Sequence, residues 1–314
     1  MHDIKLIRKD PNLYKKKFLD RNIKIDIKNL LNLDEENRSF IQKKENLEKE
    51  KKIISQKNDK SLFKKSKEIT SEIEKINSNQ NKVKKMIDNI LNSLPNVALD
   101  DVPIGADEKS NNEVKKHGFI RKFDYEPLSH DKIGKKIDQM DFDTATKVSG
   151  SRFVFLKGQL ALLERAISNF MLDVHTKEFG YKEISPPLIV SESTMYGTGQ
   201  LPKFEEDQFE VKLENEKVRK FLIPTAEVVL TNIVKDTFLN IENLPLRFVA
   251  STPCFRKEAG SYGKDTKGMI RQHQFYKVEL VSVVEPNNSI QELERMTNCA
   301  EEILKKINLP YRSV

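Results

Sequence analysis

Apolar residues recur with a helical period through the first third of the chain. No glycine or proline occurs from Asn12 to Leu94, which favours long helices there. The periodicity lapses in a polar stretch, KNDKSLFKKS, which separates two apolar stripes. The first stripe recurs every seven residues and consists of Leu33, Phe40, Leu47 and Ile54. The second alternates steps of three and four, with Gln80 as its polar member, and consists of Ile69, Ile73, Ile76, Val83, Ile87, Ile90 and Leu94. The pattern predicts two helices that pack their stripes as an antiparallel hairpin.

The remainder of the chain has a mixed pattern. Pro95, Pro103 and Gly105 lie among acidic and amide residues, a composition typical of a linker. Beyond it we expect helices at 157–179 and 293–307, an extended segment at 184–190, and strands or strand ends at 222–230, 246–252 and 269–284. This order predicts an α+β domain with an antiparallel sheet. The expected domains are a basic helical-hairpin arm at 1–100, a linker at 101–118 and the sheet domain at 119–314.

Basic charge is concentrated on the predicted hairpin. The chain has a net charge of +7, and from Ile41 to Ile90 it contains 14 lysines against 8 acidic residues. Six lysines near the tip are candidates for binding RNA: Lys51, Lys52, Lys57, Lys60, Lys64 and Lys65. A solubilising face explains any single lysine, whereas the arm as a whole suits a phosphate backbone. Coiled-coil dimerisation is a third interpretation, although the lapse in periodicity disfavours a continuous parallel rod.

Other classes of protein are disfavoured by composition. The two cysteines and five histidines are not clustered at metal-ligand spacing, so we expect neither a disulfide framework nor a structural zinc site. The charged N-terminus lacks the apolar run of a signal peptide. No stretch approaches the ~20 apolar residues that a transmembrane helix requires. We therefore expect a cytoplasmic protein with no membrane partner.

Charged residues alternate along two strand-like segments between Cys254 and Leu280. Alternation would place Cys254, Arg256 and Glu258 on one face of the first segment. On the second segment the residues that share a face are Arg271, His273, Phe275, Lys277 and Glu279. The loop between them suits a mobile flap over an anion and contains Gly260, Gly263, Gly268, Lys264 and Lys267.

A solvent-facing sheet with cross-strand ion pairs would also explain this pattern. A binding site is favoured because arginine occupies both anchor positions, Arg256 and Arg271, in a chain that otherwise prefers lysine. A guanidinium can contact phosphate or carboxylate oxygens through two donors, and Phe275 can stack on a purine. The common phosphate-binding motifs are absent: GKD at 263–265 lacks the following Ser or Thr, and GTGQLP at 197–202 has proline where a third glycine is needed. An ATP site here must therefore use an antiparallel sheet.

The segment FRKE, followed by a glycine-containing loop and RQHQFYKVEL, resembles motif 2 of class II aminoacyl-tRNA synthetases in its seryl-tRNA synthetase form. Four further segments agree with this resemblance: KVSGSRFVFLKGQLALLERAISNFMLD, GYKEISPPLIV, MYGTGQLPKF and LIPTAEV. Together with the basic hairpin, the resemblance covers nearly the whole chain. It implies a serine–tRNA ligase that activates L-serine with ATP and Mg²⁺ and charges the transfer RNA for serine, and that for selenocysteine, as a homodimer.

The resemblance also implies roles for individual residues. Thr225, Ala226, Glu227 and Glu279 match the serine-binding positions. Arg256 matches the catalytic arginine that bridges the α-phosphate and the amino-acid carboxylate. The ATP-binding positions are matched by Arg256, Lys257, Glu258, Arg271 and Phe275, and the dimer-interface proline of motif 1 by Pro187.

Motif 3 and the metal-binding acids of the family are not matched by any segment of this chain. No GxGxxR follows motif 2, so we expect no metal ligands in these residues and Mg²⁺ ligands only in a missing C-terminal part. We therefore expect a fragment or a truncated product, for which catalysis by the 314 residues alone is doubtful. The alternative is a non-catalytic RNA-binding fragment with a degenerate synthetase domain.

Overall fold

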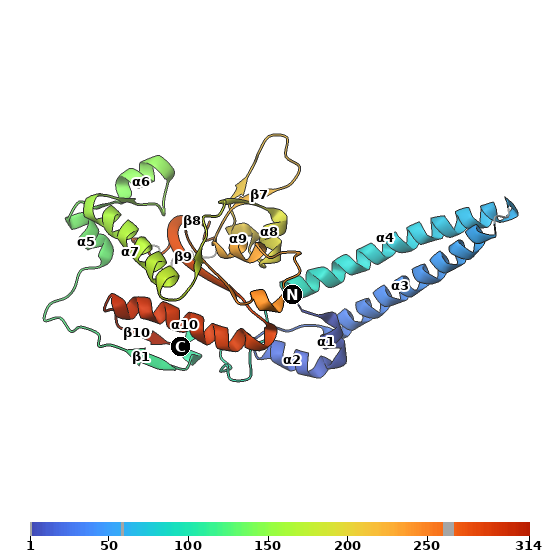
Figure 1. Cartoon of the computed structure of the whole chain (residues 1–314), viewed down its shortest axis with the longest axis horizontal. Coiled ribbons are helices and arrows are strands. Elements are labelled where there is room, and N and C mark those ends of the chain that lie inside the picture. The colour runs from blue at the N-terminus through green and yellow to red at the C-terminus, as the bar shows by residue number, and fades with distance from the viewer. Residues whose placement is uncertain (1, 58–59, 260–266) are drawn as a thin grey trace. The chain divides into compact units, whose positions relative to one another are not determined.

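The computed structural model describes residues 2–57, 60–259 and 267–314. It divides into two compact units, Met1–Asn112 and Glu113–Val314. The first unit is helical and the second is built around small sheets with helices packed on them (Figure 1). The predicted order, a helical hairpin followed by an α+β domain with an antiparallel sheet, is confirmed.

Two long helices form the hairpin of the first unit. Helix α3 (Ile27–Gln56) and helix α4 (Phe63–Ser93) run side by side in opposite directions, with the short helix η1 (Lys60–Leu62) before α4 (Figure 1). The side chain of Asp26 accepts a hydrogen bond from the backbone N–H of Asn29 at 3.0 Å and so caps α3. Two short helices precede the hairpin, α1 (Ile4–Lys9) and α2 (Pro11–Leu19).

The first unit has its apolar core at the base of the hairpin. The buried members are Ile7, Ile27, Leu30, Val83, Ile87 and Leu91. The second predicted stripe is therefore partly correct, since it supplies Val83 and Ile87, whereas Leu33 and Phe40 of the first stripe are only partly buried. Asp34 is also buried and accepts hydrogen bonds from Arg8 at 2.8 Å and Arg38 at 3.1 Å. These two pairs compensate the burial of its carboxylate.

The second unit contains a three-stranded sheet in the order β4–β8–β9. Strands β8 (Leu246–Phe255) and β9 (Gln274–Val283) are antiparallel over their full length, as predicted. The short strand β4 (Lys182–Glu183) pairs with β8 in parallel, which the sequence pattern did not predict. A second three-stranded sheet has the order β5–β7–β6, formed by Ile189–Ser191, Lys220–Leu222 and Glu210–Val211.

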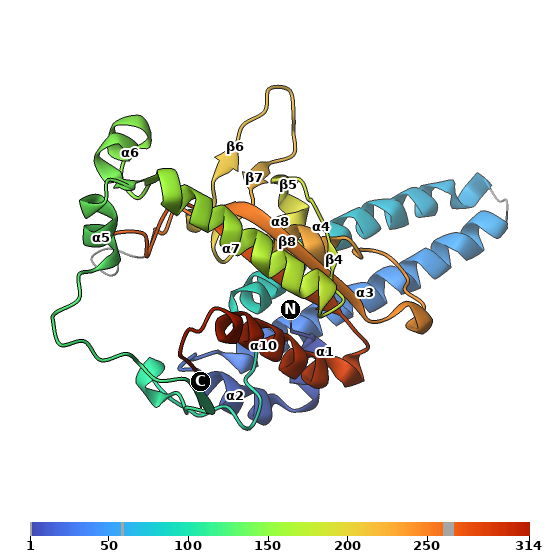
Figure 2. The same cartoon turned by 60° about the vertical axis from the view of Figure 1, so that its left-hand side comes forward.

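Helices cover both faces of the β8–β9 pair. On one face, helix α7 (Gly158–Lys177) and helix α10 (Ser289–Lys306) lie over a core that includes Tyr181, Val249 and Cys299 (Figure 2). On the other face, Ala226 and Leu230 pack against Phe248 and Ala250 of β8. The charged residues of motif 2 follow this second face, so the candidate site lies opposite α7 and α10.

Smaller elements complete the two units. They are α5 (His130–Lys136), α6 (Phe142–Ser149), α8 (Glu192–Gly197), α9 (Glu227–Asn232), the short helices η2 (Glu108–Ser110), η3 (Glu205–Asp207), η4 (Ile241–Asn243) and η5 (Pro286–Asn288), and the strand pairs β1 (Lys115–His117) with β10 (Tyr311–Ser313) and β2 (Met140–Asp141) with β3 (Phe155–Leu156). Of these, η2 belongs by contacts to the first unit. The stretch 101–118, expected to be a linker, thus includes η2 and β1. No helix in the described ranges is long and apolar enough to cross a membrane.

One strand prediction is wrong. The segment 222–230 is not extended beyond Leu222, because a turn follows and Glu227–Asn232 forms helix α9. The hydroxyl of Thr225 accepts a hydrogen bond from the backbone N–H of Glu227 at 3.1 Å, which stabilises the start of the helix. A short apolar run such as VVL fits a strand or a buried helix equally well, so the pattern alone could not distinguish them.

Candidate active site

The floor of the candidate site is one face of the β8–β9 pair. Directly opposed residues share a face of a sheet, and the register opposes Cys254 to Phe275 and Ala250 to Glu279. Lys277 lies between them on the same strand face. The predicted alternation is therefore correct for Phe275, Lys277 and Glu279.

A turn at 223–227 is joined to the end of β8. The backbone N–H of Phe255 donates to the carbonyl of Ile223 at 2.9 Å. The Nε of Arg256 donates to the carbonyl of Pro224 at 3.3 Å. These two hydrogen bonds bring the predicted catalytic arginine beside the predicted serine-binding turn.

A second connection runs from the same turn to β9. The hydroxyl of Thr225 donates to Oε2 of Glu279 at 2.5 Å. Thr225 and Ala226 are buried, whereas Glu227, the first residue of α9, is exposed. The structure thus brings Thr225, Glu227 and Glu279 together, with Ala226 next to Thr225 in the chain; their role in binding serine stays a prediction.

The carboxylates of Glu227 and Glu279 and the cations of Lys277 and Arg256 lie close together beside Thr225. Lys277 forms an ion pair with Oε2 of Glu279. The pKa of Glu227 is raised above its ordinary value, first because desolvation of its carboxyl group disfavours the charged form, although the residue as a whole is exposed, and then because the carboxylate of Glu279 is near. The positive charges of Lys277 and Arg256 oppose that rise in the pKa of Glu227. Such a balanced set of charges suits a zwitterionic ligand.

Arg256 lies over the aromatic ring of Phe275, which is part of the site floor. Its Cζ is 5.2 Å from the centroid of the Phe275 ring, which is a cation–π contact. The guanidinium and the aromatic ring that were predicted to bind the α-phosphate and the adenine are therefore adjacent. In this structure the guanidinium covers the ring.

The ATP-side residues Glu258 and Arg271 lie beyond the ends of the two strands. NH1 of Arg271 donates to Oε2 of Glu258 at 3.0 Å. Glu258 has a φ of 52°, a left-handed conformation that breaks strand alternation. The prediction that Cys254, Arg256 and Glu258 share one strand face is therefore wrong at Glu258, because β8 ends at Phe255.

Two residues that the sequence reasoning missed hold this turn in place. Oδ1 of Asp207, in η3, accepts a hydrogen bond from the N–H of Ala259 at 2.8 Å, and the carbonyl of Asp207 accepts one from the N–H of Lys257 at 2.9 Å. NH1 of Arg152 donates to the carbonyl of Glu258 at 3.0 Å. Since both residues are distant in sequence, no local pattern marks them as part of the site.

Part of the predicted flap cannot be described. Gly260, Gly263 and Lys264 lie outside the described residues. At the far end of the loop, Gly268 has a φ of 69°, and a Cβ there would lie 2.2 Å from Nε2 of His130. Only glycine fits this position without a shift of the neighbouring chain.

The predicted RNA-binding lysines lie around the tip of the hairpin. The side chains of Lys52, Lys57, Lys64 and Lys65 are exposed, whereas Lys51 is half-buried. Lys65 of α4 pairs with Glu50 of α3 at 2.8 Å, which raises the pKa of its ammonium group. Whether any of these lysines binds RNA remains a prediction.

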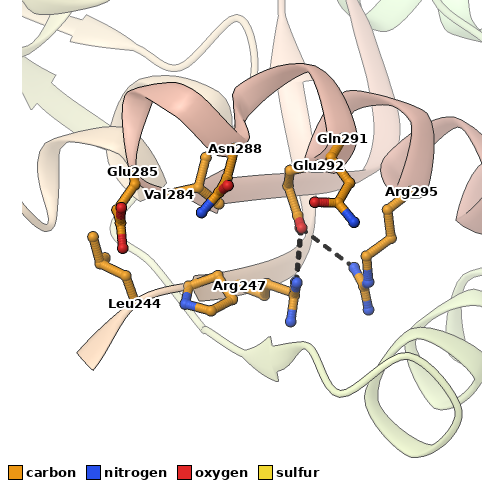
Figure 3. Close-up of a pocket in the computed structure, with 9 residues that line it drawn as sticks. Leu244, Arg247, Val284, Glu285, Asn288, Gln291, Glu292 and Arg295 are labelled. Carbon is orange, nitrogen blue, oxygen red and sulfur yellow. Dashed lines mark hydrogen bonds and ion pairs between the residues drawn. The ribbon is translucent and has the colours of Figure 1, made fainter. Parts of the chain in front are cut away.

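A cavity lies at the end of the β8–β9 pair away from the candidate site, and its charged side chains are paired with one another. It measures about 420 Å³, and Figure 3 shows Arg247 and Arg295 both directed at Glu292. Arg247 donates to both carboxylate oxygens of Glu292 at 2.7 Å, and Ser282 donates to one of them at 2.8 Å. The hydrogen bonds from Arg247, followed by the other donors, lower the pKa of Glu292. The carboxylate already has its partners, so we regard this cluster as support for α10.

The described residues do not form a metal site. Across 2–57, 60–259 and 267–314, no group of three or more His, Cys, Asp or Glu is placed to hold a metal ion. The site geometry is therefore interpreted through protein groups alone.

Comparisons with known proteins agree with this geometry. Residues 209–314 match the family model described as the tRNA synthetase class II core domain (G, H, P, S and T), and residues 1–98 match the seryl-tRNA synthetase N-terminal domain. The chain is 60% identical to the serine–tRNA ligase of Pelagibacter ubique, covering 100% of this chain and 75% of that protein. It is 48% identical to the serine–tRNA ligase of Ehrlichia canis, covering 99% and 74%.

Two solved structures of serine–tRNA ligases have the same fold as this chain. Seryl-tRNA synthetase from Pyrococcus horikoshii, complexed with ATP, superposes with a TM-score of 0.86 at 33% identity, covering 99% of this chain and 76% of that one. Cytoplasmic serine–tRNA ligase from Naegleria fowleri, in complex with AMP, gives a TM-score of 0.81 at 28% identity, covering 96% and 71%. The fold and the motif 2 geometry define a class II aminoacyl-tRNA synthetase. Within that class, the chain belongs to the seryl-tRNA synthetase family.

Proposed function

We propose that this chain provides the serine- and ATP-binding floor of a serine–tRNA ligase, an enzyme that activates L-serine with ATP and transfers the seryl group to its transfer RNA. The observation that carries the proposal is the pair of connections from one turn: Pro224 to Arg256 and Thr225 to Glu279. These hydrogen bonds hold the guanidinium of Arg256 and the carboxylate of Glu279 in one small site. A guanidinium can bind an anion, and a carboxylate can accept a hydrogen bond from a hydroxyl group. An amino acid with a hydroxyl side chain has complementary groups for both.

We propose that serine binds as a zwitterion. Its ammonium group pairs with Glu227, its carboxylate with Arg256, and its hydroxyl donates to Glu279. Buried Thr225 and Ala226 form the wall behind it. Alanine would leave Glu279 without the hydroxyl donor, and an unpaired polar group in a binding site costs about 1–3 kcal/mol.

Activation of serine then requires two negatively charged groups, the serine carboxylate and the α-phosphate of ATP, to come into contact. The serine carboxylate attacks the α-phosphorus of ATP, a bond forms between them, and pyrophosphate leaves. Arg256 reduces the repulsion between the two groups and stabilises charge in the transition state. No general base is needed, because an α-carboxylate is already ionised near pH 7.

The ATP side of the proposal involves Lys257, Glu258, Arg271 and Phe275. Adenine would stack on Phe275, the ring that Arg256 now covers. Binding of ATP would therefore turn the Arg256 guanidinium from the ring toward the α-phosphate. Arg271, held by Glu258 at 3.0 Å, is proposed to contact the terminal phosphates.

We propose Mg²⁺ as the counter-ion of the ATP phosphates. Mg²⁺ would neutralise phosphate charge when ATP is bound. The described side chains do not fit an all-protein magnesium site, so no step above depends on one.

The hairpin arm is the proposed contact for transfer RNA. Its lysine-rich tip presents Lys52, Lys57 and Lys64 to solvent, and phosphate contacts of this kind weaken as salt rises. The proposed partners are the transfer RNA for serine and, as the family resemblance implies, that for selenocysteine; lysine–phosphate contacts themselves would not read sequence.

A homodimer with Pro187 at the interface is also proposed. Pro187 is exposed, and α7 exposes both Leu162 and Leu163. Exposed apolar side chains on a helix favour contact with a second copy. We propose a cytoplasmic location, which agrees with two free, buried cysteines.

The direct test is charging of unfractionated transfer RNA with labelled amino acids. Serine should be incorporated and alanine should not. Binding of transfer RNA without incorporation of serine would contradict the catalytic proposal and favour the non-catalytic RNA-binding interpretation.

A further inference from the structure

Lys277 occupies the middle of the site floor, and no role follows for it from the proposed reaction. It lies between Phe275 and Glu279 on the same face of β9. Its side chain is 31% exposed and pairs with Glu279, whose side chain is 20% exposed. A lysine held this close to a predicted substrate-binding acid affects what that acid can bind.

Both contacts made to Glu279 fall on the same oxygen. Oε2 accepts the hydrogen bond from Thr225 and is the atom that pairs with Lys277. Within the described part of the chain, no donor contacts Oε1. One oxygen of the carboxylate is thus fixed from two sides, and the other remains available to accept a hydrogen bond.

We propose that Lys277 is a positioning residue for serine selection: by holding Oε2 of Glu279 it directs Oε1 to the substrate hydroxyl. The inference rests on the proposed function and adds a specificity determinant to that same site. Without Lys277 the carboxylate would be held by Thr225 alone and could rotate, so either oxygen could face the ligand. The hydroxyl would then lose its preorganised acceptor.

Lys277 also sets the charge balance of the site. The groups around it are Glu279 on its own strand, Glu227 at the start of α9, Arg256 at the end of β8, and Cys254 on β8. Removing the lysine would leave two carboxylates with one nearby cation. The pKa of Glu227, already raised, would rise further, because Lys277 is one of the two charges that lower it.

The test compares Lys277→Met with Lys277→Arg in the full chain. Methionine keeps the apolar stem but removes the charge and the donors, whereas arginine keeps both. Lys220→Met is the matched control, since Lys220 also lies on a strand, has a side chain 29% exposed and pairs with Glu216 at 3.4 Å away from the site. Binding of L-serine, L-alanine and ATP is measured by titration calorimetry from about pH 5 to pH 8.

We expect Lys277→Met to weaken serine binding about 10-fold or more, with a smaller change for alanine, so that the serine-to-alanine preference falls. Serine binding should also be lost at a higher pH on acidification than in the wild type. Lys277→Arg should restore both properties, and Lys220→Met should match the wild type.

Several results would overturn the inference. One is a Lys277→Met chain with unchanged serine affinity and pH profile. Another is equal loss of serine and alanine binding, or loss of ATP binding alone, which would assign Lys277 to the nucleotide. A wild-type chain that binds no serine would contradict the proposed function itself, and the inference with it.

Discussion

The hydroxyl of Thr225 has two partners in the site. It donates to Glu279 at 2.5 Å and accepts from the N–H of Glu227 at 3.1 Å. One buried side chain therefore fixes both Glu279, the proposed acceptor of the serine hydroxyl, and the start of the helix that bears Glu227, the proposed partner of the ammonium group. This dual role could not be predicted from the sequence, since the two partners lie 2 and 54 residues away.

Replacement of Thr225 by valine tests this arrangement. Valine has nearly the same shape but no hydroxyl, so Glu279 loses a donor and the N–H of Glu227 loses its acceptor. We expect serine affinity to fall about 10-fold or more, measured by calorimetry. Thr225→Ser should bind serine nearly as the wild type does. Equal affinity in Thr225→Val and the wild type would contradict the role of the hydroxyl.

Strand alternation made part of the site predictable at the residue scale. Phe275, Lys277 and Glu279 lie on one face because β9 is regular through all three. Glu258 departs from the pattern because its φ of 52° turns the chain after β8 ends. Arg152 and Asp207 were not predictable, because their contacts to the motif 2 turn are tertiary and leave no periodic signal.

At the scale of elements, the hairpin was predictable because its apolar seam has a clear period. Its stability, however, is concentrated at the base, where Ile87 of α4 packs with Leu30 of α3 and Ile7 of α1. Toward the tip the helices present mainly polar side chains: Ile53 is 54% exposed, and Ile69 is a buried residue outside the cluster at the base.

Ile87→Ala should therefore destabilise the chain. Loss of a buried isoleucine side chain costs about 2–5 kcal/mol, depending on how far the cavity collapses. Urea unfolding followed by circular dichroism at 222 nm, a helix signal, would measure it. Ile53→Ala, the same change at an exposed position of the hairpin, should have little effect. Similar losses of unfolding free energy from both substitutions would contradict the idea that the apolar core of the hairpin lies mainly at its base.

The pair of strands β1 and β10 is joined to α10 through Glu301. This buried carboxylate accepts hydrogen bonds from Tyr311 at 3.0 Å and Ser313 at 2.9 Å and forms an ion pair with Lys115. The contact with Lys115, followed by those with the two hydroxyl groups, lowers the pKa of Glu301 from 4.5 to about 2.

The lowered pKa predicts a loss of stability in acid. An acid with a lowered folded-state pKa stabilises the fold above its unfolded value, and this contribution is lost as the pH falls from 4.5 to about 2. Thermal unfolding of Glu301→Gln should show a lower melting temperature near neutral pH and a weaker pH dependence in that interval. Glu294→Gln, at an exposed position of the same helix, is the control. Parallel pH curves for Glu301→Gln and the wild type would contradict the assignment.

At the scale of the whole molecule, the chain has two units, one for the proposed RNA contact and one for the candidate active site. The unit Met1–Asn112 carries the basic hairpin, and the unit Glu113–Val314 carries the site built on β8 and β9. The change in sequence pattern after Leu94 predicted this organisation, because a glycine-free helical region gives way to mixed strands and helices. The parallel pairing of β4 with β8 was not predictable, since it joins segments more than 60 residues apart.

The central claim is that Arg256 joins serine to ATP on this floor. Exchange of labelled pyrophosphate into ATP, measured with each amino acid in turn, tests it most directly. We expect exchange with serine, none with alanine, and a loss of about 100-fold or more in kcat for Arg256→Ala, because a preorganised charge is removed from the transition state. Exchange with another amino acid and none with serine, or full exchange by Arg256→Ala, would contradict it.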